Sequence, residues 1–188
     1  VEAVHSPSLR EDAMPANSPF ETMSLGAIEE ASGELHRRAG TSLRLIGELR
    51  ADELVGGRVS ARQQMAALAA TTELACISFE AIIGRAAPPS ARSDRHPSAI
   101  SAVMYGAPSL AGLLARLEQD RRMLTSLTRS LHPRFKETVT TAWGNGTIHQ
   151  LVIEFAIVEP AKIAQALEEV VRALEMTDPE SPAGEHTV

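Results

Sequence analysis

The stretch LGAIEEASGELHRRAGTSLRLIGELR, residues 25–50, has the apolar spacing of one long helix. Its apolar and small residues alternate intervals of three and four, which places them on one seam of a helix: Leu25, Ile28, Ser32, Leu35, Ala39, Ser42, Ile46 and Leu49. Ser24, directly before the seam, has a side chain suited to a helix N-cap. The sequence therefore predicts that the first ordered element is an amphipathic helix.

The same stretch carries a glycine at every seventh position: Gly26, Gly33, Gly40 and Gly47. A glycine in a helix interior costs about 1 kcal/mol relative to alanine. Small residues let helix backbones approach closely, which can offset that cost. We expect the stripe to be a packing interface, filled by the next helix of the chain or by the same helix of a second copy. A chance pattern in a sequence rich in Gly and Ala is the alternative.

A second helix follows a short glycine turn. Gly56 and Gly57 favour the turn, and the residues after it repeat the helical spacing: Ala61, Met65, Leu68, Thr72, Ala75, Phe79 and Ile82. Two consecutive helices with a short connection pack antiparallel. We therefore predict an N-terminal antiparallel helical hairpin over residues 23–86.

Prolines and small polar residues mark the boundaries of the ordered chain. Residues 1–22 contain three prolines and no apolar periodicity, so we expect a disordered leader. Residues 177–188 have a similar composition and are expected to form a disordered tail. Three more prolines fall within residues 87–99, which predicts a linker or long loop.

Residues 100–176 are predicted to form a helix, a β-hairpin and a helix. Pro108 and Pro133 bound the first of these helices, and its seam is leucine-rich: Leu110, Leu113, Leu117, Leu124, Leu127 and Leu131. Asp120 occupies a seam position of this helix. Because a buried carboxylate needs a partner, we expect Asp120 at a solvated edge.

The hairpin is predicted from two strand-like runs, residues 138–143 and 148–158, on either side of the turn signal Gly144-Asn145-Gly146. Pro160 then begins a last helix, whose inward residues are Ile163, Leu167, Val170 and Leu174. Only 3% of the residues are aromatic, whereas 44% are hydrophobic, which favours packed helices over a β-sandwich. The predicted fold class is α+β, predominantly α-helical, with one core shared by both halves.

Composition narrows the class of protein. The net charge of −6 argues against a surface devoted to nucleic acid. Cys76, the single cysteine, excludes an intrachain disulfide, and its apolar neighbours favour a buried thiol. The sequence has no apolar run of 18 residues and no secretory signal pattern, so we expect a cytoplasmic protein without a membrane partner.

His36 is the titratable residue of greatest interest, because it follows a seam residue and should lie at the edge of the core. The segment from His36 to Thr41 resembles the His-x-x-Lys-Gly-Ser core of histidine phosphotransfer domains, with Ala39 in place of the lysine. It also resembles the dimerisation and phosphoacceptor helices of histidine kinases. These resemblances imply a helical bundle with His36 as phosphoacceptor, and Arg37 and Arg38 could hold the phosphoryl group. A surface histidine on a charged turn is the alternative interpretation.

Other constellations give little support to an enzyme. The remaining histidines have no metal-ligand spacing, and no phosphate-binding loop or nucleophile elbow is present, so we expect neither a metal nor a cofactor. Basic residues do lie along the third predicted helix: Arg116, Arg121, Arg122 and Arg129. A solvated mixed face is the expected role of these arginines, with nucleic-acid binding as the lesser hypothesis.

The function predicted from these patterns is a non-enzymatic regulatory or assembly module that acts through helix packing as a homodimer. We expect self-association and a further protein partner. Phosphorelay through His36 is the first alternative, and nucleic-acid binding through the arginine-bearing helix is the second.

Overall fold

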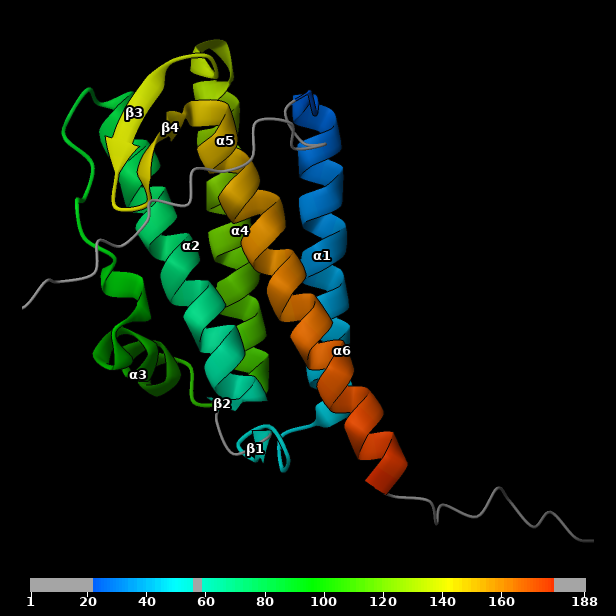
Figure 1. Cartoon of the computed structure of the whole chain (residues 1–188). Coiled ribbons are helices and arrows are strands. Elements are labelled where there is room, and N and C mark those ends of the chain that lie inside the picture. Colours follow the sequence, from blue (N-terminus) through cyan, green and yellow to red (C-terminus); the bar gives the residue numbers. More distant parts are fainter. Residues whose placement is uncertain (1–21, 56–58, 178–188) are drawn as a thin grey trace, which may run out of the picture.

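The computed structural model describes residues 22–55 and 59–177. Its main body is a bundle of four long helical rods (Figure 1): α1 (Leu25–Ile46), α2 (Ala61–Ile83), α4 (Leu110–Leu131), and a continuous rod of α5 (Ile148–Ile153), a π turn (Glu154–Val158) and α6 (Glu159–Thr177). The fold is α+β and predominantly α-helical, as predicted. The predicted leader and tail lie outside the described residues, apart from Thr22 and Thr177.

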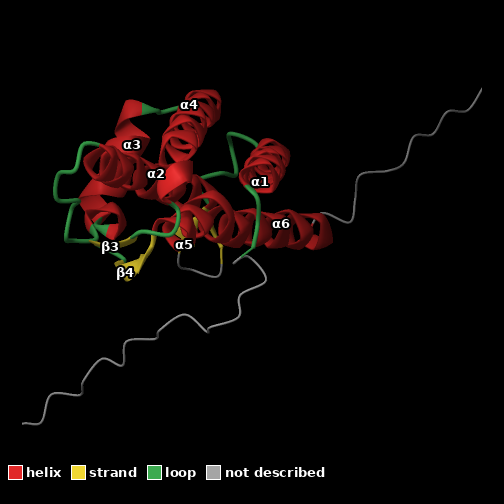
Figure 2. Cartoon of the chain, turned by 90° about the horizontal axis from the view of Figure 1, so that it is seen from above, coloured by secondary structure: helices red, strands yellow, loops and turns green. Residues whose placement is uncertain are grey.

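The close neighbours in the bundle are pairs of parallel helices. α1 packs on α6 and α2 packs on α4 (Figures 1 and 2). Ion pairs cross both contacts, from Arg38 to Glu168 and from Arg116 to Glu73. α1 and α2 run antiparallel, as the sequence predicts, but they contact each other little because α4 and α6 separate them. The connections of the chain therefore do not determine which helices pack most closely.

α1 begins and ends at residues with capping chemistry. The Ser24 hydroxyl accepts a hydrogen bond from the Ala27 amide at 3.3 Å, which satisfies one of the free amides of the first turn. The helix ends at Ile46, since Gly47 takes φ +76°, a conformation that favours glycine. The expected extension of the helix to residue 50 is wrong, and Leu49 is 95% exposed beyond its end.

α2 is the most buried helix of the bundle. Two short antiparallel strands precede it, β1 (Leu54–Val55) and β2 (Val59–Ser60), and the predicted turn glycines 56 and 57 lie outside the described residues. Ser60 and Gln63 form a reciprocal capping box at its start. By length and composition this helix could cross a membrane, but 67% of its apolar window is buried inside the protein. Such burial is typical of a core helix.

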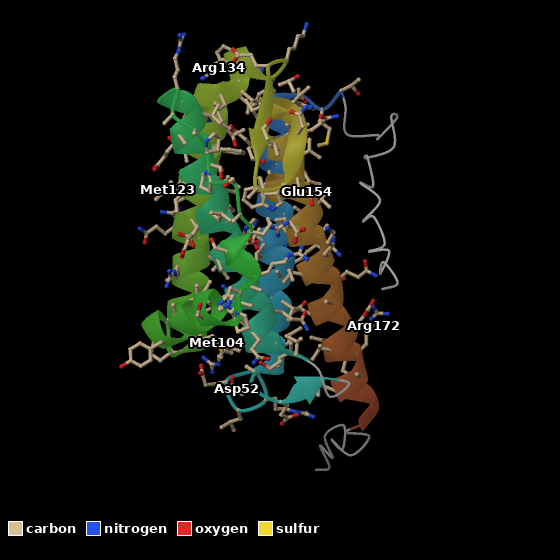
Figure 3. All side chains as sticks on the ribbon, turned by 60° about the vertical axis from the view of Figure 1, so that its left-hand side comes forward. Asp52, Met104, Met123, Arg134, Glu154 and Arg172 are labelled. Carbon is tan, nitrogen blue, oxygen red and sulfur yellow. The ribbon has the colours of Figure 1, made fainter. Side chains whose placement is uncertain are left out.

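The connection from α2 to α4 is more ordered than the predicted linker. It contains a short 3₁₀ turn, Ser93–Arg95, and the helix α3 (Pro97–Gly106), which begins inside the segment 87–99. His96 caps α3 by accepting from the Ser98 amide at 3.3 Å, and Pro97 takes the first helical position. Met104 of α3 is partly buried against the bundle (Figure 3).

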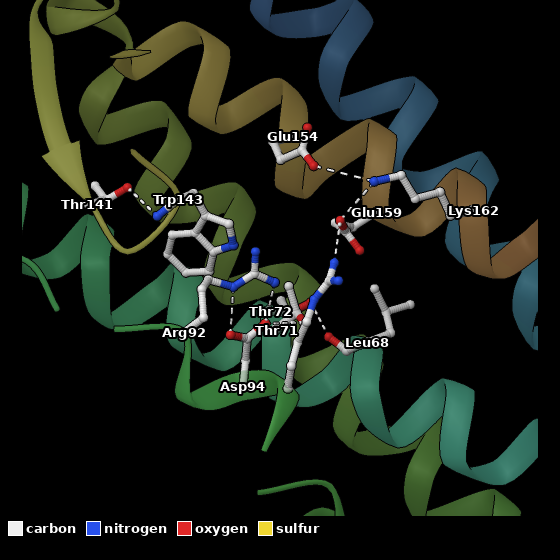
Figure 4. Close-up of polar contacts among 11 residues, drawn as sticks. Leu68, Thr71, Thr72, Arg92, Asp94, Thr141, Trp143, Glu154, Glu159 and Lys162 are labelled. Atoms are coloured by element: carbon white, nitrogen blue, oxygen red, sulfur yellow. Dashed lines mark hydrogen bonds and ion pairs between the residues drawn. The ribbon is translucent and has the colours of Figure 1, made fainter. Parts of the chain in front are cut away.

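Asp94 fastens this connection to the bundle. Its buried carboxylate accepts from Arg92 and from the Thr71 hydroxyl of α2, and the Arg92 guanidinium also lies 4.9 Å from the ring centre of Trp143 (Figure 4). Three separate parts of the chain therefore meet at one charged cluster.

The predicted hairpin exists, but its second strand and its turn are displaced. The strands are β3 (Thr138–Thr141) and β4 (Gly144–Thr147), paired with Thr141 opposite Gly144, so that Ala142 and Trp143 form the turn. Residues 148–158, expected to be a strand, are helical. Thr147 and Gln150 form a capping box that starts the helix. Most of the apolar residues of the segment are buried: Ile148, Leu151, Val152, Ile153, Phe155, Ala156 and Ile157. Such a segment has the same continuous apolar run as a buried strand.

The last rod also differs at Pro160, which lies inside a continuous helix. Proline has no amide to donate to the carbonyl of Ala156 and would clash with it in a regular α-helix. Ala156 belongs to the π turn Glu154–Val158, where the backbone is wider. The π turn therefore accommodates the proline without breaking the rod.

Both halves of the chain contribute to the core, as predicted. One part of the core joins α1, α2, α3, α4 and α6. The other part joins the N-terminal half of α1 and the C-terminal halves of α2 and α4 to α5 and the π turn. The expectation that Asp120 is solvated is wrong, because this residue is only 8% exposed between α4 and α2. The leucine seam of α4 continues through it into the core.

Candidate functional site

A cavity of about 300 Å³ lies between α1 and α4 and contains several of the predicted site residues. α2 supplies part of its lining, so that residues from three helices surround it: Gly33, His36, Arg37, Ala39, Gly40, Arg44, Met65, Leu68, Leu114, Leu117, Glu118 and Arg121. Its volume is at the lower end of the range for ligand pockets. The apolar lining comes from residues of all three helices, while the charged lining comes from α1 and α4.

The glycine stripe does not pack against α2, so the first of the two predicted occupants is wrong. A Cβ added to Gly26 or to Gly33 would meet no other group within 4 Å, and one added to Gly40 would lie 3.4 Å from a methyl carbon of Leu114 in α4. Gly47 lies beyond the helix end. The structure separates the four glycines: Gly33 and Gly40 line the cavity, Gly26 is exposed, and Gly47 is a cap.

His36 forms part of the cavity wall. Its Nδ1 donates to the Ser32 carbonyl at 2.9 Å, which leaves the lone pair of the neutral ring on Nε2. Nε2 is buried and finds no hydrogen-bond partner among the described residues. Burial lowers the pKa of His36 below its usual value, and the positive charge of Arg121 acts in the same direction. The imidazole is therefore neutral, and its one acceptor atom is covered by the protein.

The arginines near His36 have different roles. Arg37 pairs with Glu34 one turn earlier, whereas Arg38 points away from the cavity and forms two hydrogen bonds with Glu168 of α6. Arg44 is exposed, makes no ion pair within the described residues, and places Nη1 3.8 Å from the position of a Cβ on Gly40. Of the two arginines proposed to assist His36, only Arg37 lines the cavity.

α4 supplies a carboxylate and a guanidinium that the sequence analysis did not connect with His36. Arg121 donates two hydrogen bonds to Glu118, both at 2.8 Å, and Arg122 donates one at 2.7 Å. Hydrogen bonds from Arg121 and Arg122 lower the pKa of Glu118 to about 2, so this carboxylate is charged. No motif marks residues so far apart in the sequence as neighbours, and only the packing of α4 near α1 reveals them.

The arginines of α4 are all paired with carboxylates. Arg116 contacts Glu73, Arg129 contacts Glu29, and Arg121 and Arg122 share Glu118. Paired guanidiniums attract phosphate less than free ones do, because their charge is already balanced. The face that carried the nucleic-acid hypothesis is therefore a mixed-charge face.

Other reactive groups of the described chain do not form a metal or nucleophile site. In residues 22–55 and 59–177, no three of His, Cys, Asp and Glu lie close enough to hold a metal ion. Burial raises the pKa of Cys76 to about 12, which keeps its thiol protonated and unreactive.

A second concavity, of about 780 Å³, lies where α4 leads into the hairpin and α1 begins. The ring of Phe135 stands 5.1 Å from the imidazoles of both His132 and His149. Arg134 is already bonded to Glu137 and to the Ile82 carbonyl, and His149 Nε2 donates to the Met23 carbonyl. Since these polar groups are satisfied within the chain, the α1–α4 cavity offers the more available chemistry.

Comparison with known proteins finds no matching family model, no significantly similar curated protein and no significantly similar solved structure.

Proposed function

We propose that the protein is a non-enzymatic regulatory or assembly module that forms a homodimer through the outer face of α1. The observation that carries this proposal is a pair of unused opposite charges. Among the charged side chains of α1, Glu29, Glu34, Arg37 and Arg38 make ion pairs, whereas Glu30 and Arg44 make none within the described residues.

Glu30 and Arg44 lie on the same exposed face, because about four helical turns separate them. Gly26 and Gly33 occupy that face too, where no group fills the space beside them. The stripe therefore combines close approach for a second helix with a negative charge near one end and a positive charge near the other.

A two-fold axis beside Arg37, which lies midway between Glu30 and Arg44 and is balanced by Glu34, would pair both of these charges. In an isologous contact every pair of residues occurs twice, once in each direction. Two antiparallel copies of α1 therefore place Glu30 of each protomer beside Arg44 of the other. Such exposed ion pairs contribute at most about 1 kcal/mol each. Their main effect is to select the antiparallel orientation and to exclude the parallel one.

Charge reversal tests this dimer. We expect Glu30→Arg to weaken self-association about tenfold or more at low salt, because two arginine–arginine contacts replace two ion pairs. The double variant Glu30→Arg/Arg44→Glu restores the pairing and should recover the wild-type mass. Light scattering coupled to size-exclusion chromatography measures both, and a monomeric wild type at high micromolar concentration would contradict the proposal.

Phosphotransfer through His36 is the alternative. It is favoured by the Nδ1 hydrogen bond to Ser32, which leaves the nucleophilic lone pair on Nε2, and opposed by the burial of that atom. This alternative predicts an acid-labile phosphoryl label after incubation with acetyl phosphate, absent from His36→Gln. An unlabelled wild-type protein would exclude acetyl phosphate as the donor and leave the helix-packing function as the better account.

A further inference from the structure

We infer that the contact between α2 and α4 is a pH-sensitive joint, in which loss of the Asp120 proton loosens α4 from α2 and opens the Cys76 thiol to solvent. The two helices run side by side (Figure 1). This joint is separate from the outer face of α1, so it goes beyond the proposed dimer and does not depend on it. Three features of the contact lead to it.

The first feature is a buried carboxylate oxygen without a donor. Asp120 of α4 is buried against α2, and its Oδ2 finds no hydrogen-bond partner among the described residues. A charged carboxylate away from water needs donors or an opposite charge, whereas the protonated carboxyl is neutral and loses much less on burial. The closed contact therefore suits the protonated form of Asp120.

The second feature is that the charges around Asp120 do not compensate it. Glu73 of α2 and Arg116 of α4 form an ion pair, with Nη2 2.5 Å from Oε1, so the arginine is already balanced. Burial, and then the charge of Glu73, raise the pKa of Asp120 to about 6, although Arg116 acts in the opposite direction. Cys76 and Glu80 of α2 face the same contact and bring no positive charge.

The third feature is the position of the cysteine. Cys76 is buried, and its Sγ donates a weak hydrogen bond, 4.0 Å long, to the main-chain carbonyl of Asp120. Ile77, the next residue of α2, and Met123, one turn further along α4, are both exposed (Figure 3). The contact therefore lies close to solvent, and a small separation of the helices gives water access to the thiol.

The direction of the pH effect follows from linkage. In the open form the Asp120 carboxylate is in water and has the pKa of an ordinary aspartate, about 3.9, whereas in the closed form the pKa is about 6. The proton therefore stabilises the closed form fully below pH 4, and this contribution is lost as the pH rises through 6. With these two pKa values, the opening equilibrium should increase about tenfold between pH 5 and pH 8.

The test measures how fast dithiodipyridine, a disulfide reagent, modifies Cys76 in the full native chain at pH 5 and at pH 8. Dividing each rate by the rate for the urea-unfolded chain at the same pH removes the titration of the thiol itself. We expect this normalised rate to be about tenfold higher at pH 8 than at pH 5. Equal normalised rates at the two pH values would overturn the inference.

Two variants assign the effect to the carboxylate. Asp120→Asn cannot ionise, so its normalised rate should be the same at both pH values. Glu73→Gln removes the neighbouring negative charge and leaves Arg116 available to pair with Asp120, so it should reduce the pH difference. A tenfold difference that persists in Asp120→Asn, or a larger difference in Glu73→Gln, would contradict the proposed joint.

A second thiol position separates local opening from global unfolding. The double variant Cys76→Ala/Ala66→Cys moves the thiol to another buried position of α2, about three turns earlier. Its normalised rate at pH 8 should be at least tenfold lower than that of Cys76, because only global unfolding exposes it. Equal rates at the two positions would overturn the inference. Light scattering on the same samples reports self-association, so failure of the joint and failure of the dimer are measured separately.

Discussion

Asp94 and Asp120 are both buried against α2, on different faces of that helix. The Asp94 side chain is fully buried and accepts three hydrogen bonds, two from Arg92 and one from Thr71, each 2.8 Å long. Asp120 is 8% exposed, and its Oδ2 has no hydrogen-bond partner among the described residues. The two carboxylates therefore have similar burial and very different surroundings.

Their protonation follows from this difference. Burial raises the pKa of Asp94, but the hydrogen bonds from Arg92 and Thr71 outweigh it, so its pKa is lower than that of a free aspartate. Burial raises the pKa of Asp120 to about 6, and the negative charge of Glu73 adds to that effect. Hydrogen-bond donors, rather than depth of burial, therefore decide whether a buried carboxylate stabilises the folded chain.

The largest effect is expected from removing Asp94. Asp94→Ala leaves Arg92 and Thr71 without their acceptor and detaches the connection before α3 from α2, so the free energy of unfolding should fall by about 3 kcal/mol. Urea denaturation at pH 7 measures this loss. Asp94→Asn, which keeps the shape and one acceptor oxygen, should lose less. Equal losses in the two variants would show that the hydrogen bonds to charge contribute little.

Asp120→Asn should have the opposite sign. The folded state holds the Asp120 proton more tightly than the unfolded state, so the contribution of Asp120 to stability is greatest below pH 4 and falls as the pH rises to about 6. Asparagine cannot ionise, and the variant should gain about 2 kcal/mol over wild type at pH 8. Urea titrations at pH 4 and pH 8 measure the difference, which should nearly vanish at pH 4. A variant destabilised at pH 8 would contradict this assignment.

The smallest effect separates two neighbouring threonines of α2. The Thr71 hydroxyl donates to Asp94, whereas the Thr72 hydroxyl donates to the Leu68 carbonyl of its own helix. Thr71→Val should cost about 1 kcal/mol, because a charged acceptor loses a donor. Thr72→Val, the control, should cost less than half as much. Thermal unfolding of both variants measures the difference. Equal shifts in Tm would show that the Thr71 hydroxyl does not stabilise the Asp94 carboxylate.

Some residues of the candidate site could be predicted from the sequence, whereas others depend on how the helices pack. The sequence identified His36 and the glycines, because a titratable residue beside an apolar seam and a heptad of glycines are visible as patterns. Glu118 and Arg121 could not be linked to His36, since their proximity depends on how α4 lies near α1. Asp120 was misplaced for a related reason: its seam position was correct, but the helix it faces was unknown.

The local sequence is enough to predict the helical seams, the N-cap at Ser24 and the fold class, because apolar periodicity and capping depend on residues within a few turns. Long-range packing was needed to establish that residues 148–158 are helical and that α1 packs on α6. It also decided that Gly33 and Gly40 border a cavity instead of touching α2. The physical reason is that a continuous apolar run is compatible with a buried strand or a buried helix, and a small-residue stripe is compatible with any close neighbour. Contacts between segments distant in the sequence select among these possibilities.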